Sequence, residues 1–94
     1  METLYALIAA LGETYNAEKI LLFGSWARGD NRERSDIDLA IYGMPKENQA
    51  LFWSDIDDLP TLLEFDLVHI TEHTDAELMQ EIKKDGMTLY EKKD

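Results

Sequence analysis

The chain has 94 residues, of which 45% are hydrophobic and 31% are charged, a mixture typical of one folded domain and not of a disordered chain. Its net charge of -11 repels phosphate, so we expect neither a nucleic acid nor a membrane surface as a partner. The chain contains no cysteine, which excludes disulfides and thiolate chemistry, and its first residues lack the pattern of a signal peptide. These features predict a single cytoplasmic domain over residues 1–94.

The first third of the chain predicts a helix, a strand and a short helix in succession. Apolar residues at helical spacing predict an amphipathic helix over residues 2–15. The run "KILLFG", residues 19–24, predicts a short buried strand that ends at glycine. Ser25 is suited to cap a brief helix, "WAR", which Gly29 would end in a left-handed conformation. The segment "GDNRERS" then predicts a loop.

The middle of the chain predicts two strands around a helix. "DIDLAIYG", residues 36–43, alternates between polar and apolar side chains, the pattern of a strand with one buried face. Residues 46–58 carry an apolar stripe at helical spacing, in which Phe52 and Trp53 are candidates for the core or, for one of them, an interface. The run "LLEFDLVHI", residues 62–70, predicts a second long strand.

The last quarter of the chain predicts a helix and a final strand. Thr74 and Glu77 form a capping box at the start of a helix that reaches about Lys84. "MTLYE", residues 87–91, predicts a short strand. This alternation indicates an α/β (α+β) fold with a small mixed sheet flanked by helices. We do not expect a strictly doubly wound topology, because the first two strands are joined by only about a dozen residues.

Two carboxylates stand close together at the start of the second strand. Asp36 and Asp38 point to the same face, because side chains alternate along a strand, with about 6.5 to 7 Å between their α-carbons. Two such charges repel each other unless a cation lies between them, and hard oxygen ligands suit Mg²⁺ or Mn²⁺. Since Mg²⁺ takes its other ligands from water and phosphates, the pair predicts a phosphate-bearing substrate.

The turn before these acids provides a place for a phosphate. Gly24 allows close approach of the backbone, and Ser25 opens a short helix whose free N–H groups can bind phosphate oxygens. Three arginines follow nearby in this acidic chain: Arg28, Arg32 and Arg34. We predict a phosphate or carboxylate contact for Arg28, with weaker support for the other two.

A two-metal site needs a third acid. Asp66 and Glu64 share one face of the third strand, because they are two residues apart. We favour Asp66, since it lies deeper in the apolar run, where an unpaired charge is costly. Glu64 is the alternative.

The segment "GSWARGDNRERSDIDL" resembles the signature of the polymerase-β-type nucleotidyltransferase superfamily: Gly-Ser, about ten residues, Asp-x-Asp, and a later acid on a separate strand. The chain is most similar to its minimal nucleotidyltransferase (MNT) family. The resemblance covers nearly the whole domain. Trp26 departs from it, because relatives commonly carry a polar or basic residue at this position.

The resemblance implies transfer of a nucleoside monophosphate, AMP from ATP, onto a hydroxyl with the help of two Mg²⁺ ions. By motif, Gly24 and Ser25 would hold the triphosphate, and Asp36, Asp38 and Asp66 would be the catalytic metal ligands. Many MNT proteins neutralise a HEPN ribonuclease toxin as antitoxins, some by adenylylating a tyrosine. The resemblance therefore implies a HEPN partner and a hetero-oligomer.

Two other functions stay open at this stage. The chain could be a binding antitoxin whose own site is idle, although an adaptor has no physical need for mutually repelling carboxylates. It could also transfer the nucleotide to a small molecule, such as an aminoglycoside. No base-reading residue can be located, so the sequence does not predict the nucleotide preference.

Overall fold

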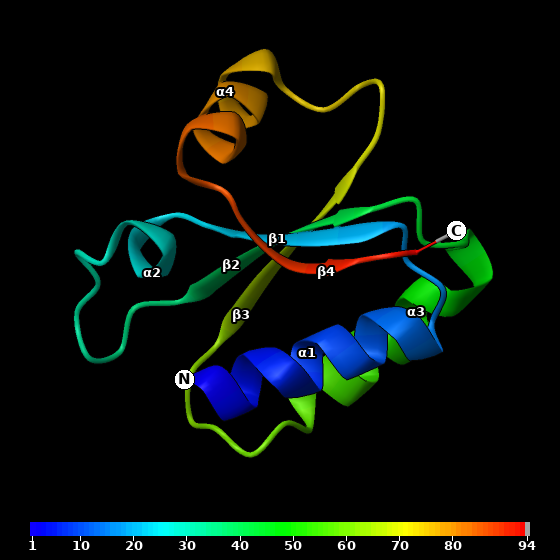
Figure 1. The fold of residues 1–94 in the computed structure, drawn as a ribbon, viewed down its shortest axis with the longest axis horizontal. Coiled ribbons are helices and arrows are strands. Elements are labelled where there is room, and N and C mark those ends of the chain that lie inside the picture. Colours follow the sequence, from blue (N-terminus) through cyan, green and yellow to red (C-terminus); the bar gives the residue numbers. More distant parts are fainter. Residues whose placement is uncertain (94) are drawn as a thin grey trace.

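A computed structural model describes residues 1–93, in which helices and strands alternate along the chain (Figure 1). The elements are α1 Glu2–Thr14, β1 Lys19–Phe23, α2 Ser25–Arg28, β2 Ile37–Tyr42, α3 Lys46–Asp57, β3 Phe65–Ile70, α4 Ala76–Asp85 and β4 Met87–Glu91. All of the predicted elements are present, and their bounds differ from the expected ones by a few residues. None of the helices in this part of the chain is long and apolar enough to cross a membrane.

The strands form one mixed sheet in the order β3-β2-β1-β4. β1 is antiparallel to β2 and to β4, whereas β2 and β3 are parallel. The antiparallel pairing of β1 with β2 agrees with their short connection, because a parallel crossover needs a longer one. The predicted mixed sheet is therefore confirmed.

The helices cover the two faces of the sheet unequally. α1 and α3 lie on one face and α4 lies on the other (Figure 1). The larger core, between the sheet and helices α1 and α3, contains the fully buried side chains of Ile37, Leu39 and Phe52. On the opposite face Ile82 of α4 packs against Ala40 of β2. Because neighbouring residues of β2 point to opposite faces, the acids at its start point toward the face that carries α4.

Two predicted helix caps differ from those in the structure. The last helix is capped by Asp75, whose Oδ2 accepts a hydrogen bond from the Leu78 N–H at 3.3 Å, and not by Thr74. The Thr74 hydroxyl instead accepts from the Thr71 N–H at 2.8 Å, which closes the preceding turn. Similarly, Ser25 is the first residue of α2, and the capping position before it belongs to Gly24.

Candidate active site

The turn after β1 lies directly against the start of β2. Phe23 is paired with Asp38 in the antiparallel ladder, so Gly24 follows at the point where the Asp38 side chain lies. Gly24 is buried and has φ 74°, a conformation that favours glycine. A Cβ at this position would lie 3.1 Å from Asp38 Cγ and would overlap Oδ2. The glycine therefore makes room for the carboxylate.

The strand register brings the predicted acids together at the end of the sheet where β2 and β3 begin, which we call the acidic edge. Asp38 of β2 is paired with Asp66 of β3 in the parallel ladder, and Asp36 lies one residue before β2. Alternation along the two strands directs all three carboxylates to the face that carries α4, because Ala40 and Val68 pack there. Residues far apart in the sequence thus form one acidic edge beside the Gly24-Ser25 turn.

The argument from burial for Asp66 was wrong, because its side chain is exposed. It is the register, and not a costly buried charge, that places Asp66 beside Asp38. Glu64, the alternative, precedes β3, and its carbonyl oxygen accepts a hydrogen bond from the Ile37 N–H at 2.9 Å. Its backbone therefore extends the pairing of β2 with β3.

The electrostatics of the edge centre on Asp38. The pKa of its carboxyl is raised from 3.8 to about 6, chiefly by partial burial and then by the negative charges of Asp66, Asp36 and Glu81, against a lowering effect of Arg28. The Asp38 carboxylate is thus held in a strongly negative environment. A bound cation would relieve this repulsion.

The donor set fits Mg²⁺ presented by a nucleotide. All three side chains offer carboxylate oxygens, the ligand type that Mg²⁺ prefers. Within residues 1–93, however, no three acidic or histidine side chains are close enough together to hold a metal ion by themselves. A magnesium ion that takes its remaining ligands from phosphates and water needs no such cage.

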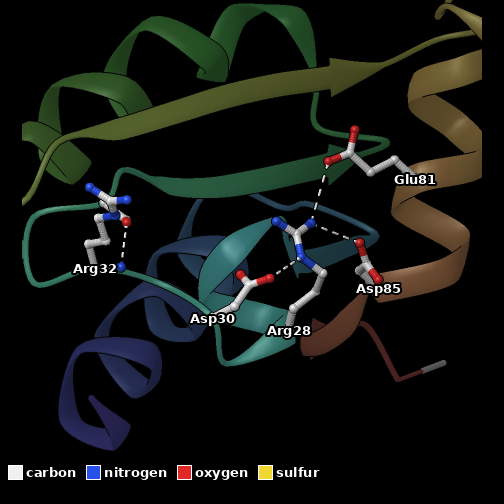
Figure 2. A network of polar contacts seen from close by, with 6 residues as sticks. Arg28, Asp30, Arg32, Glu81 and Asp85 are labelled. Atoms are coloured by element: carbon white, nitrogen blue, oxygen red, sulfur yellow. Dashed lines mark hydrogen bonds and ion pairs between the residues drawn. The ribbon is translucent and has the colours of Figure 1, made fainter.

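Arg28, at the end of α2, is the centre of a network of ion pairs (Figure 2). Its Nε lies 3.0 Å from Asp30 Oδ2, and its Nη1 lies 3.1 Å from Asp85 Oδ2 and 3.8 Å from Glu81 Oε1. These contacts raise the pKa of Arg28, chiefly through the hydrogen bond to Asp30 and then that to Asp85. Of the two contacts predicted for this arginine, the structure shows the one to carboxylates. Because Glu81 and Asp85 belong to α4, the network joins that helix to the turn.

The loop between α2 and β2 is closed by Trp26. Its indole Nε1 donates a hydrogen bond to the Ser35 carbonyl at 2.7 Å, and its ring packs against the larger core. The Arg32 N–H donates to Ser35 Oγ at 2.8 Å, as Figure 2 shows in part. Trp26 therefore has a structural use that accounts for the departure from the family pattern.

Sequence reasoning missed Glu81 and Asp85. No role was predicted for either residue, and the predicted last helix ends at about Lys84, before Asp85. Asp85 is nevertheless only 11% exposed. No short motif links it to Arg28, which lies 57 residues earlier, so only the folded chain reveals the pair.

A family model described as "Polymerase beta, Nucleotidyltransferase" matches residues 6–94. The chain belongs to this family. It is 33% identical over 64 residues, 68% of its own length and 74% of the relative's, to a "Putative protein adenylyltransferase" of Methanocaldococcus jannaschii. The resemblance seen in the sequence is thereby confirmed, and with it the assignment of this nucleotidyltransferase as an enzyme.

Solved structures share the fold of this nucleotidyltransferase. It aligns with a toxin-antitoxin complex crystallised with AMP-PNP at a TM-score of 0.73 and 22% identity, over 98% of this chain and 74% of that one. It also aligns with a complex of a tri-AMPylated Shewanella oneidensis HEPN toxin and an MNT antitoxin, at a TM-score of 0.69 and 20% identity, over 98% and 74%. At these identities the similarity shows the fold, which is the predicted one.

Proposed function

We propose that this nucleotidyltransferase transfers AMP from ATP to a hydroxyl group of a protein. The observation that carries the proposal is the pairing of Asp38 with Asp66 beside the Gly24-Ser25 turn, which brings acids and a phosphate-binding turn to one edge. The name of the archaeal relative, a protein adenylyltransferase, supports a protein as acceptor. AMP-PNP in one structural neighbour supports ATP as the donor.

In the proposed reaction the acceptor oxygen attacks the α-phosphorus of ATP. A new O–P bond forms, the bond from the α-phosphorus to the bridging oxygen breaks, pyrophosphate leaves, and the hydroxyl proton passes to water. The backbone N–H groups at Gly24 and Ser25 hold the triphosphate, which fixes the line of attack. Asp36, Asp38 and Asp66 would hold Mg²⁺, which when bound neutralises charge on the phosphates and the leaving group.

We further propose that the acceptor is a HEPN toxin and that this chain is its antitoxin. The support comes from the structural neighbours, of which one is an AMPylated HEPN toxin with an MNT antitoxin. The strongly acidic surface also suits a basic protein better than an acidic one. The phosphate contact predicted for Arg28 stays a prediction, since its guanidinium faces carboxylates in the structure.

The proposal is tested by incubating the purified protein with α-labelled ATP, Mg²⁺ and a purified HEPN-domain protein from the same genome. We expect label on the HEPN protein and loss of its ribonuclease activity. The variant with Asp36→Ala and Asp38→Ala should transfer no label and should not neutralise. Glu33→Ala, which removes an exposed acid of the neighbouring loop, is the control and should act as the wild type does.

Neutralisation by the double variant without any transfer of label would show a binding antitoxin instead. Label on neither protein, with wild-type enzyme and several HEPN-domain proteins, would contradict transfer to this class of acceptor. Pyrophosphate release measured in parallel separates hydrolysis of ATP from transfer.

A further inference from the structure

A groove with both polar and apolar walls lies where α3 and the following loop meet the start of β3. It has a volume of about 430 Å³, and its walls include Trp53, Asp57, Leu62, Leu63, Glu64 and Phe65. α3 supplies the tryptophan, and the segment between α3 and β3 supplies both leucines.

Two of the apolar side chains that line this groove are unusually exposed for their type. Leu62 is 98% exposed and Trp53 is 60% exposed, although Phe52, the neighbour of Trp53, is fully buried. Apolar side chains that line a groove and remain in contact with water commonly mark a binding surface. Tryptophan is also enriched among the residues that dominate the energy of protein interfaces.

The groove is continuous along the chain with the acidic edge. Glu64 and Phe65 belong to its lining, and the next residue is Asp66, which is paired with Asp38. Consecutive α-carbons are about 3.8 Å apart. Because α3 and the carboxylates lie on opposite faces of the sheet, the groove and the acidic edge meet only at the start of β3, where Glu64 comes two residues before Asp66. A protein seated in the groove would leave uncovered the Gly24-Ser25 turn, which follows β1, because β2 separates β1 from β3 in the sheet.

The charge around the groove selects the kind of occupant. Its lining contains the acids Asp57 and Glu64 and no lysine or arginine. Asp58, the next residue along, is exposed as well. Within a chain of net charge -11, this surface favours an apolar side chain carried by a basic segment.

We propose that this groove is the docking surface for the acceptor protein, which inserts an apolar side chain from a basic segment between Trp53 and Leu62. The inference rests on the proposed function, because it takes the acceptor to be a protein. It adds the surface by which the acceptor is held and the chemistry of the segment that binds. The groove positions the acceptor, and the acidic edge carries out the transfer.

The test compares two leucines that are both largely exposed. Leu62→Gln changes the groove, whereas Leu51→Gln changes a leucine that is 58% exposed on α3 but is not part of the groove lining. Binding of the HEPN-domain protein is measured by calorimetry without nucleotide, and AMP transfer is measured separately. We expect Leu62→Gln to weaken binding and raise the acceptor KM about tenfold or more, with the KM for ATP unchanged. Leu51→Gln should alter neither by more than about twofold.

Charge reversal gives a second measurement. Asp57→Lys should weaken binding at low salt, and the loss should shrink as the salt concentration rises, because a charge contact is screened. Full binding and an unchanged acceptor KM in Leu62→Gln would overturn the proposal, as would equal losses in Leu62→Gln and Leu51→Gln. Sedimentation of the wild type as a dimer that Leu62→Gln dissociates, with acceptor binding intact, would assign the groove to a second copy of this chain.

The outcomes separate this proposal from the proposed function. Binding that depends on Leu62 without any transfer of AMP contradicts the enzymatic role and leaves the docking surface supported. Transfer of AMP that is insensitive to both substitutions contradicts the docking surface and leaves the enzymatic role supported.

Discussion

Gly24 and Asp38 are packed so closely that the glycine has no space for a side chain. A Cβ at Gly24 would lie 3.1 Å from Asp38 Cγ and would overlap the carboxylate oxygen Oδ2. The Gly24-Ser25 turn and the central carboxylate are therefore fitted to each other. Any shift of one would displace the other.

Gly24→Ala should consequently abolish activity and destabilise the protein. Alanine at φ 74° is strained, and its methyl group would push Asp38 away, at a total cost of about 3 kcal/mol. Gly29→Ala is a matched control, because Gly29 also has a positive φ of 82° but no atom lies within 4 Å of the added Cβ. It should cost only about 1 kcal/mol and leave most of the activity. Urea denaturation and initial transfer rates check both variants, and equal rates for the two would contradict the coupling.

Asp38→Asn should inactivate the enzyme but stabilise the folded protein near neutral pH. The pKa of Asp38 is about 6 in the folded state, above its ordinary value of 3.8, so the ionised carboxylate disfavours folding. Stability of the wild type should fall as the pH rises from 4 to 6 and level off above 6. For a carboxyl that is only partly buried, we expect a gain of about 1 kcal/mol in the variant at pH 7. Denaturation at pH 4, 5, 6 and 7.5 measures it, and a gain that persists at pH 4 would contradict this cause.

Asp66→Asn should reduce the rate of AMP transfer about 100-fold or more, because it removes a carboxylate from the edge where charge develops. Glu64→Gln, the matched change two residues away, should reduce it far less. Asp66 is exposed, so both proteins should retain the stability of the wild type within about 0.5 kcal/mol. Rates of AMP transfer at saturating ATP, measured for both variants, test this prediction. A larger loss in Glu64→Gln would move the third acid to that residue.

Arg28→Met should raise the KM for ATP by about tenfold or more, since the turn would lose its connection to α4. Arg28→Lys should recover only part of the effect, because one ammonium group cannot reproduce the two separate contacts that the guanidinium makes with Asp30 and Asp85. If Arg28 acts by holding the turn against α4, Asp85→Asn should raise the KM for ATP as Arg28→Met does. If Arg28→Met raises the KM for ATP while Asp85→Asn has normal kinetics, the guanidinium contacts the phosphate directly.

Mg²⁺ should bind tightly only together with a nucleotide. Among residues 1–93, no three acidic or histidine side chains lie close enough together to hold a metal ion by themselves. Phosphate oxygens therefore have to complete the coordination. Calorimetric titration of MgCl₂ should show saturable binding with a non-hydrolysable ATP analogue, at least about tenfold tighter than with the protein alone. Equal affinity in both titrations would indicate a preformed metal site.

The sequence predicted the helices and strands well because they depend on local patterns. The spacing of Asp36 and Asp38 requires only strand alternation, and glycine before a short helix requires only turn chemistry. The burial of Asp66 was predicted wrongly, since an apolar run does not reveal that the strand lies at the edge of the sheet. Likewise, Thr74 and Asp75 are both good caps, and local sequence does not decide between them.

Contacts between distant segments were beyond prediction. The pairing of Arg28 with Asp85 depends on how α4 crosses the sheet, and no periodicity encodes that angle. The groove near Leu62 arises in the same way, from the meeting of a helix, a loop and a strand. For the aromatic pair on α3 the sequence predicted two core residues, with an interface as the alternative for one of them, and only Phe52 is buried. The structure identifies Trp53 as the exposed one.

The hydrogen bond from the Trp26 indole to the Ser35 carbonyl anchors the end of the loop between α2 and β2, directly before Asp36. The indole fixes the point where the loop returns to the sheet, and the hydrogen bonds between Arg32 and Ser35 hold the same point from within the loop. Exposed side chains inside the loop, such as those of Glu33 and Arg34, can therefore be exchanged without moving the point at which the chain enters β2.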